Sequence, residues 1–265
     1  MNLLDEVDKI KQDRYSEANA EAKLCQDIII KAISQSSLNR NVTIKGGVVM
    51  RSMSKNARRA TQDLDLDFIR FSISEESISV FIEKLNCIDG IYLQMSAPIE
   101  ELKHQDYKGK RIYIEISDDF GNVLSLKMDI GVHKDLDIEQ EEYCFDVCFQ
   151  EDSASVLINS REQMIAEKLK SLMRFGTRST RYKDVFDICY LSDLADMDKL
   201  RFCIQKYIYA DTTIDVNDAA EIRKRAERIF TSDTYKKQVE RSKKNWLDMS
   251  VDEVLKKDLE FLYRI

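Results

Sequence analysis

The chain has 265 residues, of which 43% are hydrophobic and 34% are charged, and its formal net charge is −7. This length predicts one large domain or two modest ones, and the hydrophobic content is sufficient for a buried core. No apolar run reaches the roughly 20 residues that cross a bilayer, and the N-terminal sequence is too polar for a signal peptide. The negative charge argues against a protein that coats nucleic acid indiscriminately. We therefore expect a soluble, cytoplasmic protein with no membrane partner.

Helical spacing and the absence of Gly and Pro in the first forty residues predict one or two N-terminal helices. From Val42 to about Phe149 the pattern changes to short β-rich runs. One helix interrupts them between Glu75 and Leu85, after the capping signature Ser72-x-x-Glu75. This segment predicts a domain built around a mixed sheet.

A second capping signature, Ser160-x-x-Gln163, introduces four or five predicted helices that continue to the C-terminus. We therefore expect the α+β class. Residues 1–155 would form the N-terminal helices and the mixed-sheet domain, and residues 156–265 would form a C-terminal helical domain.

Positive charge is concentrated in three segments of this acidic chain. Residues 45–59, 161–183 and 222–244 have net charges of +5, +5 and +6. Such clusters indicate local sites for phosphate groups, and solvated helix faces are the alternative. For residues 222–244 we favour the solvated face.

Three aspartates, Asp63, Asp65 and Asp67, alternate with apolar residues and would lie on one face of a strand. Asp129 interrupts a second apolar run, where an unpaired buried charge costs several kcal/mol. Carboxylates held together repel one another unless a divalent cation neutralises them. The pattern predicts a site for Mg²⁺ or Mn²⁺, and an edge strand with one wet face is the alternative.

A double glycine precedes this acidic strand. Lys45 ends a predicted strand, Gly46 and Gly47 form a turn, and a short helix follows. Backbone N–H groups at such a turn form an anion site, to which Lys45 adds a charge. The turn, the hydroxyl of Thr61 and the D-x-D strand follow one another in the order expected of a nucleotide site. A tight turn without a ligand is the alternative.

The second half of the chain adds charged residues at helical positions. Lys168 lies within the apolar stripe of its predicted helix. Its ammonium group therefore either contacts phosphate or extends past the apolar surface to solvent. Asp184 lies at the margin of the next stripe. The alternative to a functional role there is a simple helical ion pair, Arg181 with Asp184 or Lys183 with Asp187. Arg178, in the loop between these helices, is available for a triphosphate or an RNA acceptor, and a merely solvated arginine is the alternative.

Taken together, the motifs resemble the AbiEii/AbiGii-type nucleotidyltransferase toxins of abortive-infection and type IV toxin–antitoxin systems. The matching segments are Lys45-Gly46-Gly47-Val48-Val49, Arg59-Ala60-Thr61-Gln62-Asp63-Leu64-Asp65, Met128-Asp129-Ile130, Glu167-Lys168-Leu169 and Arg181-Tyr182-Lys183-Asp184-Val185-Phe186-Asp187. Asp67 is a carboxylate that the family pattern does not require.

The resemblance implies a nucleotidyltransferase fold related to DNA polymerase β and the transfer of a nucleoside monophosphate from a nucleoside triphosphate. It implies that the metal ligands are Asp63, Asp65 and Asp129, and that the catalytic residues are these three with Lys168 and Asp184. The expected nucleotide-binding residues are Lys45, Gly46, Gly47, Thr61, Lys168, Arg178 and Arg181.

The resemblance also implies an RNA acceptor, with tRNA the family-based expectation, and a winged-helix AbiEi-type antitoxin as partner. Two other classes remain open from the residues alone. A metal-dependent hydrolase or glycosyltransferase uses a similar D-x-D, and a non-catalytic relative would hold a nucleotide or a protein without turnover.

Overall fold

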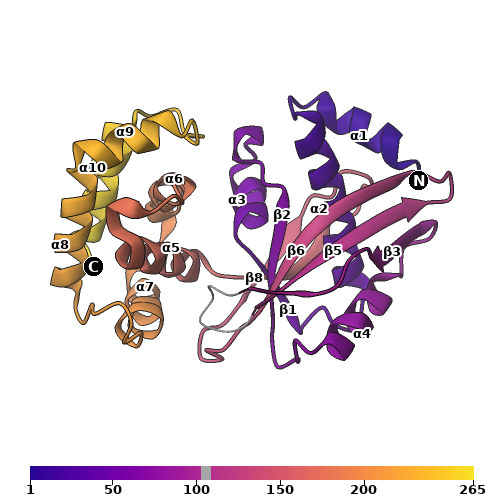
Figure 1. Ribbon diagram of the computed structural model, residues 1–265, viewed down its shortest axis with the longest axis horizontal. Helices are drawn as coiled ribbons and strands as arrows, with labels where there is room; N and C mark the ends of the chain where they lie inside the picture. Colours follow the sequence, from indigo (N-terminus) through magenta and orange to yellow (C-terminus); the bar gives the residue numbers. More distant parts are fainter. Residues whose placement is uncertain (103–108) are drawn as a thin grey trace. The chain divides into compact units, whose positions relative to one another are not determined.

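The computed structural model describes residues 1–102 and 109–265, which divide into two compact units. Unit 1 comprises Met1–Asn159 and unit 2 comprises Ser160–Ile265 (Figure 1). Among the described residues, no helix has both the length and the apolar character needed to span a membrane.

Unit 1 consists of a mixed eight-stranded sheet and its helices. The order along the sheet is β3-β5-β6-β2-β1-β8-β7, with β4 paired to β5. β2 runs antiparallel to β1 and parallel to β6. In chain order the elements are α1 (Leu3–Lys11), α2 (Glu17–Gln35), β1 (Val42–Lys45), α3 (Gly47–Ser54), β2 (Asp63–Phe68), α4 (Glu75–Leu85), β3 (Ile91–Met95), β4 (Glu100–Leu102), β5 (Gly109–Asp118), β6 (Val123–Val132), β7 (Glu141–Phe145) and β8 (Ala154–Ile158).

The alternation predicted for the acidic strand is present in β2. Leu64, Leu66 and Phe68 are fully buried on one face, and the Phe68 ring packs edge-on against Phe81 of α4 with ring centroids 5.0 Å apart. The aspartates point to the opposite face, as the period of two requires. The hydrophobic core of unit 1 therefore fixes which face carries the carboxylates.

Two details of unit 1 differ from the expectations. The side chain of Ser74, rather than Ser72, caps α4 by accepting a hydrogen bond from the backbone N–H of Ser77. The short run 154–158 lies beyond the predicted β-rich segment, yet it forms β8 and pairs with β1 in parallel. The two units divide after Asn159, directly beyond the end of β8.

Unit 2 is helical. Its elements are α5 (Arg161–Phe175), α6 (Lys183–Leu191), α7 (Met197–Ile204), a π-helical turn (Gln205–Tyr209), α8 (Ala219–Phe230), α9 (Asp233–Arg241) and α10 (Val251–Leu262). The Ser160 side chain caps α5 by accepting from the Gln163 N–H at 3.1 Å, as the capping signature predicts. The mixed sheet of unit 1 and the helices of unit 2 together confirm the α+β class.

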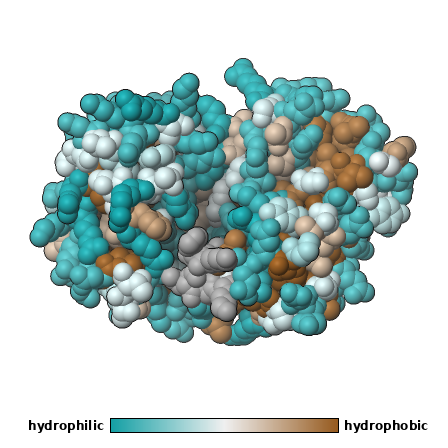
Figure 2. Space-filling model, viewed as in Figure 1, coloured by the Kyte–Doolittle hydropathy of each residue, from teal (hydrophilic) through white to brown (hydrophobic). Residues whose placement is uncertain are grey.

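The basic segment 222–244 forms α8, α9 and the residues after them. Its apolar side chains are buried, and most of its Lys and Arg residues are exposed or half-buried. The face of unit 2 seen in Figure 2 is accordingly covered mainly by hydrophilic residues. The structure thus agrees with the solvated helix face that we favoured for this segment.

Asp258 of α10 is an exception within the core of unit 2. It is completely buried, and neither carboxyl oxygen has a hydrogen-bond partner among the described residues. Burial raises its pKa well above the usual value, and the neighbouring Lys257 opposes this only in part. A buried polar group without a hydrogen bond costs about 1–3 kcal/mol.

We expect Asp258→Leu to stabilise the protein at pH 8, by about 1–3 kcal/mol. Folding raises the pKa of this carboxyl group. The free energy of unfolding of the wild type is therefore highest below the unfolded pKa, near 4, and falls as the pH rises from there toward the folded pKa. Urea unfolding at pH 4 and pH 8 would measure this: the advantage of the variant should grow between them. Glu260→Leu, at an exposed site of α10, is the matched control. An advantage that is equal at both pH values would contradict the assignment.

Candidate active site

A row of charged residues crosses the middle of the sheet of unit 1. Lys45, Asp65, Asp129 and Arg111 occupy directly paired positions on the adjacent strands β1, β2, β6 and β5. The two aspartates are therefore cross-strand neighbours, with one cation beyond each. Like charges at paired positions repel, so the row combines an unfavourable acidic pair with favourable pairs on both sides.

Arg111 is the principal partner of Asp129. Its Nε and Nη2 donate to Asp129 Oδ1 and Oδ2, each at 2.8 Å. This bidentate geometry is the strongest form of a guanidinium–carboxylate pair. The hydrogen bonds to Asp129 raise the pKa of Arg111, so its guanidinium group stays charged.

The other two carboxylates of β2 also have cations beside them. Lys127 Nζ lies 2.8 Å from Asp63 Oδ1, and Lys45 Nζ lies 2.6 Å from Asp67 Oδ1. Asp67 is nearly buried, whereas Asp63 is half-exposed. Asp67 and Lys45 therefore form an inner ion pair, and Asp63 remains accessible to solvent.

The double glycine lies directly against the acidic row. Gly46 has φ 69° and ψ −138°, and a Cβ atom there would lie 2.5 Å from Asp65 Oδ2. Gly47 is the first residue of α3, and its Cβ would lie 2.7 Å from the Cβ of Thr61. At position 46 glycine is required by the backbone conformation and by the approach to Asp65, and at position 47 by the approach to Thr61. The N-terminus of α3 thus reaches the side chains of Asp65 and Thr61.

We expect Gly46→Ala to lower the free energy of unfolding by more than about 1–3 kcal/mol, which is the cost of placing a non-glycine residue in this backbone conformation. Gly176 provides a matched control: it has nearly the same conformation, φ 57° and ψ −137°, but a Cβ there would meet no atom of the described residues within 4 Å. Thermal unfolding of both Ala variants would isolate the clash with Asp65. Equal losses of stability would show that Gly46 serves the turn alone.

Unit 2 contains a buried ionic network on α5 and α6. Lys168 Nζ lies 2.7 Å from Asp187 Oδ2 and 3.1 Å from Asp184 Oδ1. Asp187 is completely buried, and its Oδ1 accepts a hydrogen bond from Trp246 Nε1 at 3.0 Å. Arg181 Nε pairs with Asp184 Oδ2 at 2.8 Å. Lys168 therefore does not lie on a solvated face, and the predicted Arg181–Asp184 ion pair is present.

The comparisons with known proteins bear on these two groups of residues. Residues 28–263 match the sequence profile described as nucleotidyl transferase AbiEii toxin, type IV toxin–antitoxin system. The chain belongs to this AbiEii family. Membership confirms the predicted resemblance and makes the chain a relative of nucleotidyltransferases that act as toxins.

Comparisons with solved structures and with curated proteins were also made. A solved structure, an antigenic nucleotidyltransferase-like protein from Paracoccidioides brasiliensis, is 15% identical, with a TM-score of 0.42. That alignment covers 80% of this chain and 97% of the other. No curated protein matches the sequence.

The structure sorts the predicted AbiEii site residues into two groups, one in each unit. Unit 1 brings Lys45, Gly46, Gly47, Thr61, Asp63, Asp65 and Asp129 to one region of the sheet. Unit 2 holds Lys168 and Asp184 in its ionic network, with Arg181 at the margin and Arg178 exposed in a short 3₁₀ turn. The catalytic and nucleotide-binding roles of all these residues stay predictions.

The donor chemistry of unit 1 suits a divalent cation, because Asp63, Asp65 and Asp129 supply the hard carboxylate oxygens that Mg²⁺ prefers. The arrangement is not that of a preformed cage. Within residues 1–102 and 109–265, no group of three or more His, Cys, Asp or Glu side chains is gathered as metal ligands. Lys127 and Arg111 instead lie beside Asp63 and Asp129, and they compensate the acidic charge.

Sequence reasoning missed Arg111 and Trp246. The alternation in RIYIEIS places Arg111 on a polar face, but its pairing with Asp129 depends on the register between β5 and β6. Trp246 is the only tryptophan in the chain, and this is the one signal that singles it out.

Proposed function

We propose that this AbiEii relative transfers a nucleoside monophosphate from a nucleoside triphosphate to an acceptor hydroxyl and releases pyrophosphate. The observation that supports this most directly is the Asp65–Asp129 cross-strand pair, with the glycine turn against Asp65. Carboxylates beside a backbone anion site are the combination that a metal–triphosphate complex requires.

In this proposal Asp63, Asp65 and Asp129 would hold Mg²⁺ or Mn²⁺. The bound cation would neutralise charge on the phosphates and on the entering and leaving oxygens. The N–H groups at Gly47 and the start of α3 bind the triphosphate, aided by the positive end of the helix. Arg111 is the cation nearest to Asp129 and orients that carboxylate through its two hydrogen bonds. Positioning and charge compensation supply most of the catalysis in phosphoryl transfer.

We propose RNA, and tRNA in particular, as the acceptor, and a winged-helix antitoxin as the protein partner in the cytoplasm. Membership in a family of type IV toxin–antitoxin toxins supports an antitoxin as partner. The RNA acceptor and the winged-helix type of the antitoxin rest on the resemblance of the motifs alone. The exposed arginines Arg178 and Arg181 are available for the phosphates of the nucleotide or the acceptor. An adjacent gene that encodes a winged-helix protein would support the partner.

The test uses purified protein, total tRNA and each of the four nucleoside triphosphates labelled at the α-phosphate, with Mg²⁺ or Mn²⁺. We expect label on the RNA, equimolar pyrophosphate, and loss of both when EDTA removes the metal. Release of phosphate or of a nucleoside diphosphate would instead indicate a hydrolase or a glycosyltransferase. No transfer with any nucleotide or metal would remove tRNA as acceptor. Saturable nucleotide binding without turnover on total RNA would identify a non-catalytic relative.

A further inference from the structure

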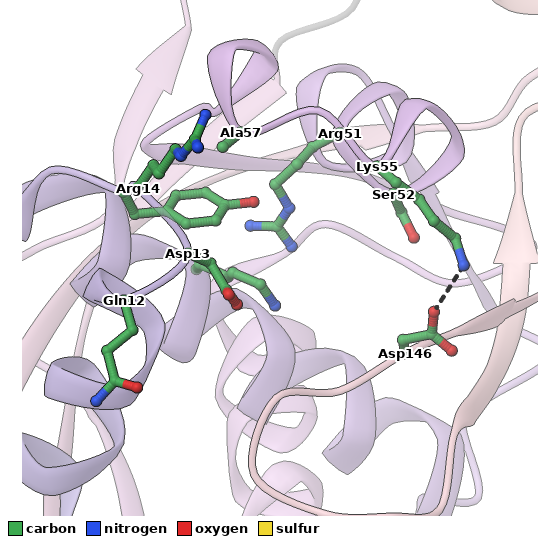
Figure 3. A pocket seen from close by; sticks show the side chains of 10 residues that line it. Gln12, Asp13, Arg14, Arg51, Ser52, Lys55, Ala57 and Asp146 are labelled. Carbon is green, nitrogen blue, oxygen red and sulfur yellow. Dashed lines mark ion pairs between the residues drawn. The ribbon is translucent and has the colours of Figure 1, made fainter.

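A polar pocket of about 560 Å³ lies in unit 1, between the segment that joins α1 to α2 and the C-terminal half of α3 (Figure 3). Its lining residues are different from those of the charged row on the sheet. Cavities of about 300–1,000 Å³ are typical of small-molecule sites. The pocket is therefore large enough for a ligand of its own.

Four cations line this pocket and come from three segments of the chain. Arg14 follows α1, Lys23 belongs to α2, Arg51 belongs to α3, and Lys55 directly follows α3. Figure 3 shows the Arg51 guanidinium group extending from α3 into the pocket, and the Lys55 side chain extending toward Asp146. This gathering of positive charge occurs in a chain whose net charge is −7.

The floor of the pocket carries more positive than negative charge. Arg51, only 5% exposed, pairs with Asp27 Oδ1 at 3.0 Å, and Lys23 pairs with the other oxygen of the same carboxylate. Two cations thus share one buried anion. Because a buried charge is costly unless it is compensated, this floor favours an additional anion.

Further charged and polar side chains at the rim of the pocket can contact a ligand. Lys55 pairs with Asp146 at 3.4 Å, but both side chains are about four-fifths exposed, and such pairs contribute little. Asp13 and the ring of Tyr15 complete one wall. The acidic groups can accept hydrogen bonds from hydroxyl or amino groups on the ligand.

A side-chain bridge connects this pocket to the acidic strand. Arg51 Nη1 donates to Gln26 Oε1 at 2.6 Å, and Gln26 Nε2 donates to the backbone carbonyls of Thr61 at 2.9 Å and Asp63 at 3.2 Å. The side chain of Gln26 therefore connects a group bound to Arg51 with the start of β2 through hydrogen bonds. Such a group also contacts α3, the helix that begins at Gly47.

We propose that the pocket binds the phosphate group of a small phosphorylated molecule, and that occupancy is transmitted through Gln26 to the segment Thr61–Asp63. A phosphate fits better than a carboxylate, because cations approach from three segments and a tetrahedral oxyanion can accept hydrogen bonds from several directions. The remaining volume accommodates the rest of the ligand. Binding at this pocket is separate from the proposed nucleotidyl transfer, and its test does not require activity.

Isothermal calorimetry with inorganic phosphate and with pyrophosphate tests the site. We expect saturable binding that the double variant Arg14→Glu/Lys55→Glu weakens at least tenfold, about 1.4 kcal/mol. Both residues are exposed, so the variant should fold. Lys84→Glu/Lys224→Glu, at exposed lysines of α4 and α8, makes the same change of four charge units and is the matched control for unspecific charge effects, so it should bind as the wild type does.

Two results would overturn the site assignment: no saturable binding of either anion, or equal affinities in the wild type and the double variant. Acetate is the carboxylate control, and equal affinity for it would refute the phosphate assignment. A short RNA oligonucleotide forms the third arm. Binding of RNA without binding of phosphate or pyrophosphate would refute a small-molecule ligand.

Hydrogen exchange tests the bridge. With bound phosphate or pyrophosphate, amide exchange in residues 61–63 should become slower in the wild type. In Gln26→Ala the calorimetric affinity should persist while the protection of residues 61–63 is lost. Protection that is unchanged in Gln26→Ala would overturn the transmission through Gln26 and leave the binding site standing.

Discussion

Replacing Lys168 with alanine is expected to destabilise unit 2 by about 3–5 kcal/mol, the usual cost of breaking a buried ion pair by removing one partner. The lysine ammonium lies between Asp184 and Asp187, and the second of these is completely buried. Without it, Asp187 retains Trp246 as a hydrogen-bond donor but loses the ammonium group that lies 2.7 Å from its Oδ2. Urea unfolding monitored by the fluorescence of Trp246, which is in this network, would measure the loss.

Two further variants make this result specific. Lys256→Ala removes a lysine that is 80% exposed on α10 and should change stability by less than about 0.5 kcal/mol. Asp187→Asn combined with Lys168→Met removes both charges and should recover much of the loss. If Lys168→Ala were as stable as the wild type but inactive, Lys168 would act on phosphates rather than in the fold.

Replacing Asp65 with asparagine is expected to reduce nucleotidyl transfer at least about a hundredfold, a loss typical of removing one group that stabilises transition-state charge. Asparagine preserves the shape of the side chain, including its approach to Gly46, but removes the negative charge beside Asp129. The initial rate of label transfer, with nucleotide and metal at saturation, is the measurement. The fold should survive, which thermal unfolding would confirm.

The matched control for Asp65→Asn is Glu115→Gln. Glu115 lies on β5 of the same sheet, and its side chain is paired with Gln94 rather than with the charged row. This variant makes the same change of charge and should retain wild-type rates. Equal activity of Asp65→Asn and the wild type would contradict the proposed role of the acidic pair and, with it, the proposed mechanism.

The carboxylates of the candidate site could be predicted from sequence because strand alternation determines the face on which each side chain lies. Leu64 and Leu66 must be buried, so Asp63 and Asp65 must lie opposite them. Lys168 was recognised in the same way, from its position within an apolar helical stripe.

The partners of these residues could not be predicted, because partnership depends on tertiary contacts. Arg111 meets Asp129 only in one register of β5 on β6, and periodicity within a strand is compatible with other registers. Trp246 donates to Asp187 across 59 positions of sequence. The strand β8 was missed because it is short and lies where the pattern changes from sheet to helix.

The contact between Gly47 and Thr61 limits how this part of the chain can vary in evolution. The two positions share a single space, since the Cβ of any larger residue at 47 would fall 2.7 Å from the Cβ of Thr61. Even alanine at 61 retains that Cβ, so an enlarged residue 47 is accommodated only if residue 61 becomes glycine or the helix shifts. A substitution of Gly47 thus requires a second change, whereas a substitution of Thr61 does not require one at position 47.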